Sequence, residues 1–391
     1  MAGAVATRTV PALLALSLLA LPGGVHASDE APETAALFDL LRAGGAGAAA
    51  ETGEGFTRAL VPREFIFPRD HGAHPEFRSE WWYFTGNLAT PDGGRFGYQW
   101  VLFRNALTPR PAARSSAWAA DQVYMSHLAL TDAAGRRFHF FERFARGAAG
   151  LAGAEAEPLR LWLEDWALVE PAGGGPWRLR AAAGEIALDL ELAPRKPVVL
   201  QGDRGLSRKS AAPGNASYYY SISRLATRGI LRLAGETHAV SGDSWLDREW
   251  GTSALADDQQ GWDWFALQLD DDTEIMFYLL RRKDGSADPF SGGALIDRAG
   301  RSTPLGRDDV ELAVLDHWHS PRGGRYPARW RLRVASRDLT LDIRPVIPDQ
   351  ELAASVRYWE GAVDVAGSLG TRPVAGRGYV ELVGYATRRG D

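Results

Sequence analysis

Apolar and polar residues alternate along most of this chain in short runs separated by turn sequences. Residues 81–104, WWYFTGNLATPDGGRFGYQWVLFR, hold two such runs around the turn at 91–94, which predicts a β-hairpin. The pattern recurs in 127–144, 274–290 and 294–305, and long runs with the helical period of 3.6 residues are nearly absent. Many short strands with regular turns favour an all-β protein of antiparallel barrels or sandwiches, with a few short helices.

The chain also repeats itself. Four segments match four later ones in the same order: 81–84 with 262–265, 132–137 with 297–302, 219–225 with 358–364, and 240–247 with 374–381. An ordered series of matches indicates two copies of one barrel-like unit. The boundary is expected near residues 250–260, and we predict an N-terminal domain over 61–255 and a C-terminal domain over 256–391.

Residues 1–27 have the features of a secretory signal peptide. Arg8 supplies a positive start, 10–21 is apolar, and the sequence Val-His-Ala at 25–27 resembles a cleavage site. The apolar run is shorter than the roughly 20 residues of a transmembrane helix. We therefore expect cleavage near Ala27 and a secreted or periplasmic protein. Residues 28–60, which include a Gly/Ala-rich run, are expected to form a flexible segment.

Composition narrows the classes of function. The 391-residue chain has a net charge of −5 and no basic run, so it is not expected to bind nucleic acid. It has no Cys, which excludes disulfides and an N-terminal lipidated Cys. Neither a P-loop nor a dinucleotide fingerprint nor a G-x-S-x-G elbow is present, and we expect no cofactor. The 14 Trp residues suit either an aromatic-lined pocket or a large β core.

The segment 243–249, DSWLDRE, carries the strongest candidates for chemistry. Alternate residues of a strand share a face, which here groups Asp243, Trp245, Asp247 and Glu249. Buried neighbouring carboxyls raise one another's pKa, as a proton donor at neutral pH requires. The alternative is a solvated strand edge on which Arg248 and Glu249 pair. The repeat places Glu381 at the position of Asp247, which equally suits a structural acid paired with an arginine.

Other candidates have a structural alternative too. His127, in the apolar run 124–130, is either catalytic or a core residue with satisfied hydrogen bonds. Glu80 shares a face with Trp82 and would need a partner if buried, for which Arg104 is the natural choice. Two histidine pairs, at 71 and 74 and at 317 and 319, lack a third ligand nearby, and we predict no metal site.

Five segments resemble one known family. HPEFRSEWWYFTGNL (74–88), GDSWLDREWG (242–251), GWDWFALQLDD (261–271) and YWEGAVDVAGS with GRGYVELVGY (358–368 and 376–385) are similar to the carotenoid 1,2-hydratase/AttH-like proteins, a group that includes predicted secreted hydrolases. The resemblance runs in order from about His74 to Tyr385. It implies two tandem lipocalin-like antiparallel β-barrel domains that bind an apolar ligand. Some members of the family hydrate isoprenoid double bonds without a cofactor, and others lie near membrane-lipid transport genes.

Three functions follow as alternatives. In the first, the protein hydrates an isoprenoid or lipid, or performs a related lyase step. In the second, it carries such a ligand without changing it and has a functional link to a membrane transporter. In the third, it cleaves glycosides with paired carboxylates. We expect a monomer or dimer. The predicted catalytic residues are Asp247, Glu249 and His127. The predicted ligand-binding residues are Glu80, Trp81, Trp82, Tyr83, Arg104, Tyr220, Trp245, Trp250, Trp262, Trp264 and Trp359.

Overall fold

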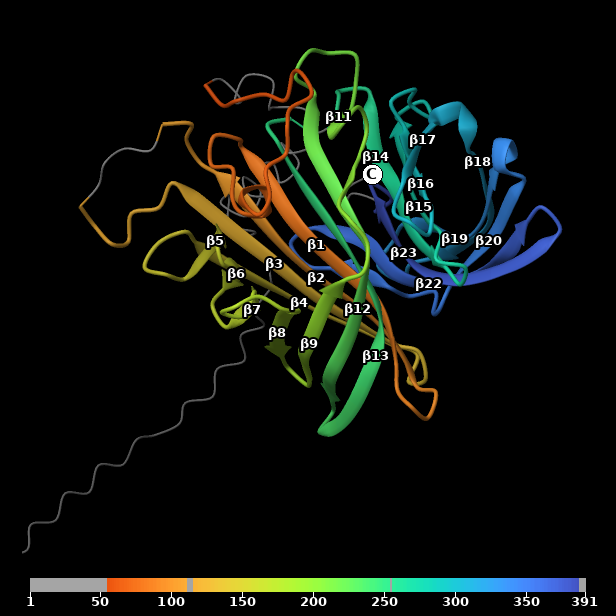
Figure 1. The fold of residues 1–391 in the computed structure, drawn as a ribbon, viewed down its shortest axis with the longest axis horizontal. Coiled ribbons are helices and arrows are strands. Elements are labelled where there is room, and N and C mark those ends of the chain that lie inside the picture. Colours follow the sequence, from red (N-terminus) through yellow and green to blue (C-terminus); the bar gives the residue numbers. More distant parts are fainter. Residues whose placement is uncertain (1–54, 111–114, 254, 387–391) are drawn as a thin grey trace, which may run out of the picture.

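The computed structural model describes residues 55–110, 115–253 and 255–386. The predicted signal peptide and residues 28–54 of the predicted flexible segment lie outside these ranges. The described chain is almost entirely β-structure, arranged as two antiparallel sheets that each curve into a barrel-like unit (Figure 1). The predicted all-β fold of two such units is confirmed.

The first sheet has 13 strands. They are β1 (Ser79–Ala89), β2 (Arg95–Ala106), β3 (Gln122–Asp132), β4 (Arg137–Arg146), β5 (Ala152–Ala156), β6 (Leu159–Leu163), β7 (Trp166–Val169), β8 (Trp177–Ala183), β9 (Ile186–Pro194), β10 (Val199–Leu200), β11 (Leu206–Arg208), β12 (Ala216–Leu233) and β13 (Glu236–Gly251). Their order is β4-β3-β2-β1-β13-β12-β9-β8-β7-β6-β5, and β10 and β11 also pair with β12.

The second sheet has 10 strands. They are β14 (Gln259–Leu269), β15 (Glu274–Arg282), β16 (Gly292–Ile296), β17 (Ser302–Gly306), β18 (Glu311–His319), β19 (Arg325–Val334), β20 (Leu339–Pro345), β21 (Glu351–Ala353), β22 (Arg357–Leu369) and β23 (Arg372–Val383). Their order is β17-β16-β15-β14-β23-β22-β20-β19-β18, with β21 on β22. Short 3₁₀ helices are η1 (Arg69–His71), η2 (Arg307–Asp309) and η3 (Ala335–Arg337).

The internal repeat is visible in the strand order and register. Strands β15-β14-β23-β22 of the second sheet repeat the order β2-β1-β13-β12 of the first. Tyr83 lies opposite Asp247 across β1 and β13, and Trp264 lies opposite Glu381 across β14 and β23. Because the registers agree with the alignment of the two sequence halves, the equivalence of Asp247 and Glu381 is structural.

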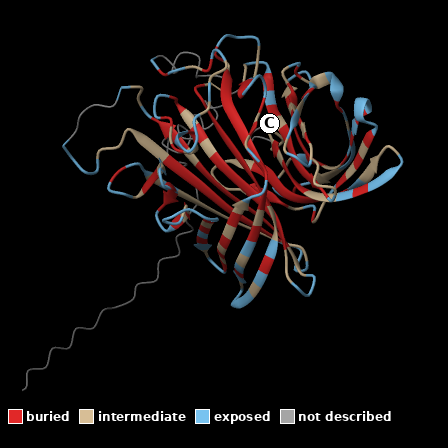
Figure 2. Cartoon of the chain, viewed as in Figure 1, coloured by how far each residue is buried: buried red, intermediate tan, exposed pale blue. Residues whose placement is uncertain are grey.

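Buried residues form three main clusters, one within each sheet and one between them. Figure 2 shows buried positions running along the long central strands. Trp82 and Phe84 pack into the core of the first sheet, whereas Tyr83 faces the second sheet, as strand alternation requires. The cluster between the sheets, here called the junction, contains buried Tyr83, Val101, Val199, Tyr219, Trp245, Trp264, Ala266, Met276, Tyr278, Leu280, Ala294, Ile296, Ala362 and Tyr379.

Buried polar contacts fix the two sheets at the junction. Glu274 of β15 forms ion pairs with Arg224 of β12, at 2.7 Å, and with Lys196, which follows β9. The Asn87 amide donates to the carbonyl of Gly378 at 3.0 Å, and the Gln268 amide donates to that of Ser223 at 2.8 Å. These bonds hold the side chains that face one another across the junction in a defined arrangement.

Candidate active site

Asp247 lies at the junction with both carboxyl oxygens hydrogen-bonded. Its Oδ1 accepts from the Ser221 hydroxyl at 2.5 Å and from the Trp245 indole at 2.7 Å, and its Oδ2 accepts from the Tyr219 hydroxyl. Asp247 is only 3% exposed. Tyr219 and Ser221 meet it because β12 pairs with β13 and brings Ser221 opposite Asp247.

Burial raises the pKa of Asp247 to about 7, even though three donors favour its carboxylate form. Within the described ranges no lysine or arginine forms an ion pair with Asp247, because Lys209, whose charge also attracts Asp247, is paired with Glu249. The loss of hydration therefore outweighs the groups that favour the carboxylate. The negative charge of Glu249 adds to the rise. Asp247 can therefore hold a proton at neutral pH and release it, as a general acid must.

Glu249 has a different environment from Asp247, although both lie on the same face of β13. Its Oε1 forms an ion pair with Lys209 at 2.8 Å and accepts from the Ser217 hydroxyl. Lys209 also lies over the Tyr219 ring, with Nζ 5.5 Å from the ring centroid. The alternative of a surface pair between Glu249 and Arg248 is wrong, because Arg248 points into the core of the first sheet.

The second sheet contributes a matching pair of carboxyls, Glu360 of β22 and Glu381 of β23. The two residues lie opposite one another in the strand register, and their side chains are in hydrogen-bonding contact. Tyr83, from the first sheet, donates to Glu360, and Trp262 donates to Glu381. The suggested pairing of Glu381 with an arginine is not found among the described residues.

Aromatic rings surround the junction carboxyls. The Trp264 ring meets Tyr83 edge-on at 5.2 Å between centroids and meets Trp245 at 6.5 Å. Its indole donates to the Tyr219 hydroxyl at 3.2 Å, which links the second sheet to Asp247. Four further aromatic residues pack against the cluster and are partly exposed: Trp81, Phe103, Trp262 and Phe290. This side of the junction reaches the solvent.

Several predicted ligand-binding residues lie on the opposite face, inside the first sheet. Glu80 forms ion pairs there with Arg104 and Arg248, and all three side chains are fully buried. The two arginines hold the pKa of Glu80 below its usual value, although burial alone would raise it. The expected partnership of Glu80 and Arg104 is confirmed, and it is a structural one.

The tryptophans near this ion pair are also structural. Arg248 stacks on the Trp82 ring at 4.0 Å, and His74 stacks on Trp250 at 3.9 Å. The Tyr220 hydroxyl bonds His71 at 2.6 Å. Trp359 belongs to the core of the second sheet. These four aromatic residues, like Glu80 and Arg104, do not face the junction. Each is next in sequence to a residue that does, and neighbouring residues of a strand point to opposite faces of the sheet.

His127 is fully buried and partnered on both ring nitrogens. Nδ1 lies 2.8 Å from the Tyr358 hydroxyl of the second sheet, and Nε2 lies 2.9 Å from Glu142. It thus joins the two sheets beside Glu360, since Tyr358 and Glu360 share a face of β22. Because both ring nitrogens are hydrogen-bonded within the protein, His127 agrees with the alternative to a catalytic role, a core histidine with satisfied hydrogen bonds.

Neither histidine pair approaches a metal-site geometry. His317 bonds Arg325, and His71 bonds Tyr220. Across the described part of the chain, no group of three His, Cys, Asp or Glu side chains is placed to hold a metal ion. No helix within the described residues combines the length and apolar character needed to span a membrane.

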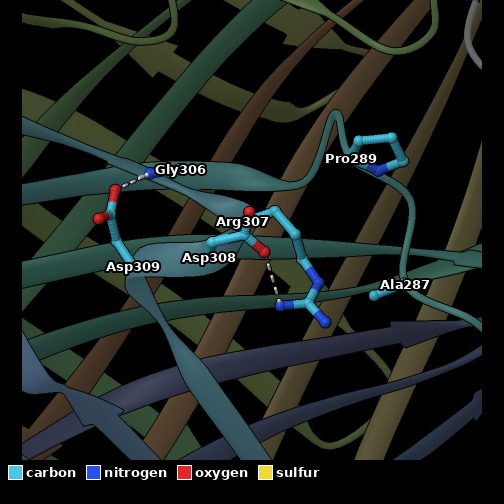
Figure 3. A pocket seen from close by; sticks show the side chains of 6 residues that line it. All are labelled: Ala287, Pro289, Gly306, Arg307, Asp308 and Asp309. Carbon is cyan, nitrogen blue, oxygen red and sulfur yellow. Dashed lines mark hydrogen bonds and ion pairs between the residues drawn. The ribbon is translucent and has the colours of Figure 1, made fainter.

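A surface pocket of about 500 Å³ lies elsewhere, between the loop before β16 and η2 (Figure 3). Its lining residues are Ala287, Pro289, Gly306, Arg307, Asp308 and Asp309. Arg307 pairs with a fully exposed Asp308 at 3.7 Å. No predicted site residue lines this pocket, and its charges are solvated, so it is a weaker candidate than the junction.

The sequence patterns missed four residues that complete the junction: Tyr219, Ser221, Lys209 and Glu360. Tyr219 and Glu360 each lie in a segment of the internal repeat, 219–225 and 358–364, and could have been found by carrying the match of Asp247 and Glu381 to the neighbouring strands. Lys209 had no such signal, because it reaches Glu249 from a loop.

Comparison with known proteins identifies the class. The AttH-like family model matches residues 58–385, so the chain belongs to the AttH-like family, as the resemblance predicted. The crystal structure of an AttH homologue from Nitrosomonas europaea is 37% identical, with a TM-score of 0.75 over 84% of this chain and 100% of that one.

Kievitone hydratase from Nectria haematococca is a more distant structural neighbour. It is 16% identical, with a TM-score of 0.64 over 85% of this chain and 97% of its own, and at that identity the likeness concerns the fold alone. Among curated protein sequences, none matches the chain.

Proposed function

We propose that this protein binds an apolar, unsaturated molecule at the junction and adds water to its carbon–carbon double bond, or removes water to form one. The observation that carries the proposal is the carboxyl of Asp247, which is buried among aromatic rings without an ion-pair partner in the described chain and whose pKa burial raises to about 7. Hydration of an unactivated alkene needs such an acid, because protonation of the double bond is the difficult step.

The surrounding rings suit the intermediate. Proton transfer from Asp247 to one alkene carbon leaves a carbocation on the other. The faces of Trp245, Trp264 and Tyr83 stabilise a cation through their negative quadrupoles. Water then attacks the cation and loses a proton. The partly exposed Trp81, Phe103 and Trp262 supply an apolar approach from solvent to this group.

A carrier that binds the ligand without changing it is the second candidate, and the hydrogen bonds made by the Asp247 carboxyl favour it. Ser221, Trp245 and Tyr219 donate to its two oxygens, so the carboxyl is satisfied without a ligand. Glycoside cleavage is less well supported, because Glu249 is ion-paired with Lys209 and cannot readily form an acid pair with Asp247.

For both the hydratase and the carrier, we propose that the predicted signal peptide exports the protein. The exported protein then meets a ligand that comes from the membrane.

The first experiment separates these two candidates. The purified protein is extracted with organic solvent before and after incubation with lipid extract from its source, and both extracts are analysed by mass spectrometry. A product that differs from its precursor by one water supports hydration or dehydration. A retained apolar molecule of unchanged mass supports the carrier.

A further inference from the structure

Glu360 has a buried oxygen without a hydrogen-bond donor. Its Oε1 accepts from Tyr83, but no donor of the described chain reaches Oε2, although the residue is 0% exposed. A carboxylate oxygen is seldom buried in this state, because it loses hydration without replacement. Besides Tyr83, a second carboxyl, that of Glu381, contacts the Glu360 side chain.

Two carboxyls in contact, away from cations, repel one another unless a proton lies between them. A proton on Glu360 satisfies the orphan oxygen and is donated to Glu381. Burial and then the charge of Glu381 raise the pKa of Glu360 well above its usual value, and the same bond favours the carboxylate of Glu381. Glu381 accepts as well from the Trp262 indole and is partly exposed.

The repeat relates this pair to Asp247. Glu381 occupies the position of Asp247 in the second copy, and Glu360 occupies the position of Ser221. Both carboxyls titrate in the same range, since burial raises the pKa of Glu381 to about 7 as it does for Asp247. The negative charge of Asp247 contributes to the rise at Glu381, which places the two within electrostatic reach across the junction.

We infer that Glu360 and Glu381 form a second proton-transfer site. Glu381 takes up the proton that water releases, and Glu360 positions the Glu381 carboxylate through a hydrogen bond. This inference rests on the proposed function. In hydration, Asp247 gives its proton to one alkene carbon, whose π electrons form the C–H bond. Water forms the C–O bond to the other carbon, and its proton passes to Glu381. Dehydration is the reverse, and solvent returns both acids to their starting states.

Infrared titration tests the shared proton without any ligand. Protonated buried carboxyls give a separate C=O band that shifts in D₂O. We expect the wild-type protein to retain one such band about two pH units above the pKa of Asp247 and Glu381, where both are ionised, and Glu360→Gln to lack it. Glu381→Gln removes the neighbouring charge, so the Glu360 band should disappear at lower pH. Tyr83→Phe removes a donor, so the band should persist to higher pH.

The control is Asp364→Asn, which removes a surface carboxylate of the same strand, paired with Arg95, and should leave the band unchanged. The other titratable groups that face the pair are Asp247, Glu249, Tyr83, Tyr358 and Tyr379. A band that survives in Glu360→Gln, or one whose titration is the same in Glu381→Gln and wild type, overturns the inference.

Turnover then separates this inference from the proposed function. Glu381→Gln should retain ligand binding and lose about 100-fold in turnover, within the usual range for a general base. If Asp247→Asn abolishes product formation while Glu381→Gln is fully active, the second site is refuted and the hydration proposal stands. If the infrared shifts occur but Asp247→Asn remains active, the pair shares a proton but the proposed function fails.

Discussion

Asp247 and Glu381 are equivalent residues of the two sheets and face the same junction. Each lies opposite an aromatic residue of the neighbouring strand, Tyr83 for Asp247 and Trp264 for Glu381. Each also has a pKa raised to about 7 by burial. A duplicated β-unit has thus placed two proton-exchanging acids around one aromatic cluster, which is the relationship on which the proposed chemistry depends.

Asp247→Asn should remove turnover and leave the fold intact. The amide oxygen still accepts hydrogen bonds from Ser221 and Trp245, but the side chain has no acidic proton to transfer. A general acid typically contributes about 100- to 10,000-fold, so product formation should fall by at least about 100-fold. Product formation by purified protein measures this, with circular dichroism as the check of folding.

The raised pKa of Asp247 also predicts how stability depends on pH. The group binds a proton more tightly when folded than when unfolded, so its contribution is fully present below about pH 4 and is lost as pH rises to about 7. One such group gives a loss of at most about 1.4 kcal/mol per pH unit. Urea unfolding between pH 5 and 7 should show a shallower loss for Asp247→Asn than for wild type. Equal slopes would mean that Asp247 is ionised throughout.

Tyr219→Phe should raise the pKa of Asp247 further. The Tyr219 hydroxyl donates to Oδ2 and favours the carboxylate, so its removal strengthens the hold on the proton. The pH above which turnover is lost should move upward, and Tyr218→Phe, on the opposite face of β12, is the matched control. A downward shift would show that the hydroxyl does not stabilise the ionised form.

Glu80→Gln tests whether the buried carboxylate of Glu80 has a structural role. The change leaves Arg104 and Arg248 buried without their countercharge, and loss of one partner of a buried ion pair costs about 3–5 kcal/mol. The free energy of unfolding in urea should fall by that amount, with ligand affinity unchanged in the folded fraction. A stable variant that no longer binds ligand would return Glu80 to the binding site.

Much of this arrangement could be predicted from local pattern. Alternation along β13 correctly separated Asp247 from Arg248, and the repeat paired Asp247 with Glu381 before any strand was placed. The same alternation puts Trp250 on the face of Arg248 and away from the junction, so the ligand-binding role predicted for Trp250 conflicts with the strand pattern itself.

The remainder depends on contacts between distant segments. Tyr83 and Glu360 are 277 residues apart in sequence, and they meet only because the two sheets pack face to face. Lys209 meets Glu249 through a loop whose path no periodicity encodes. Similarly, the two partners of His127 come from neighbouring β4 and from the other sheet. Tertiary packing, rather than strand pattern, decides which polar groups share a site.

The most direct test of the central claim compares wild type, Asp247→Asn and Asp364→Asn on the same lipid extract, with products resolved by mass. The account predicts a product one water heavier or lighter than its precursor for wild type and Asp364→Asn, and none for Asp247→Asn. Equal product formation by all three proteins, or only an unchanged bound molecule in all three, would contradict it.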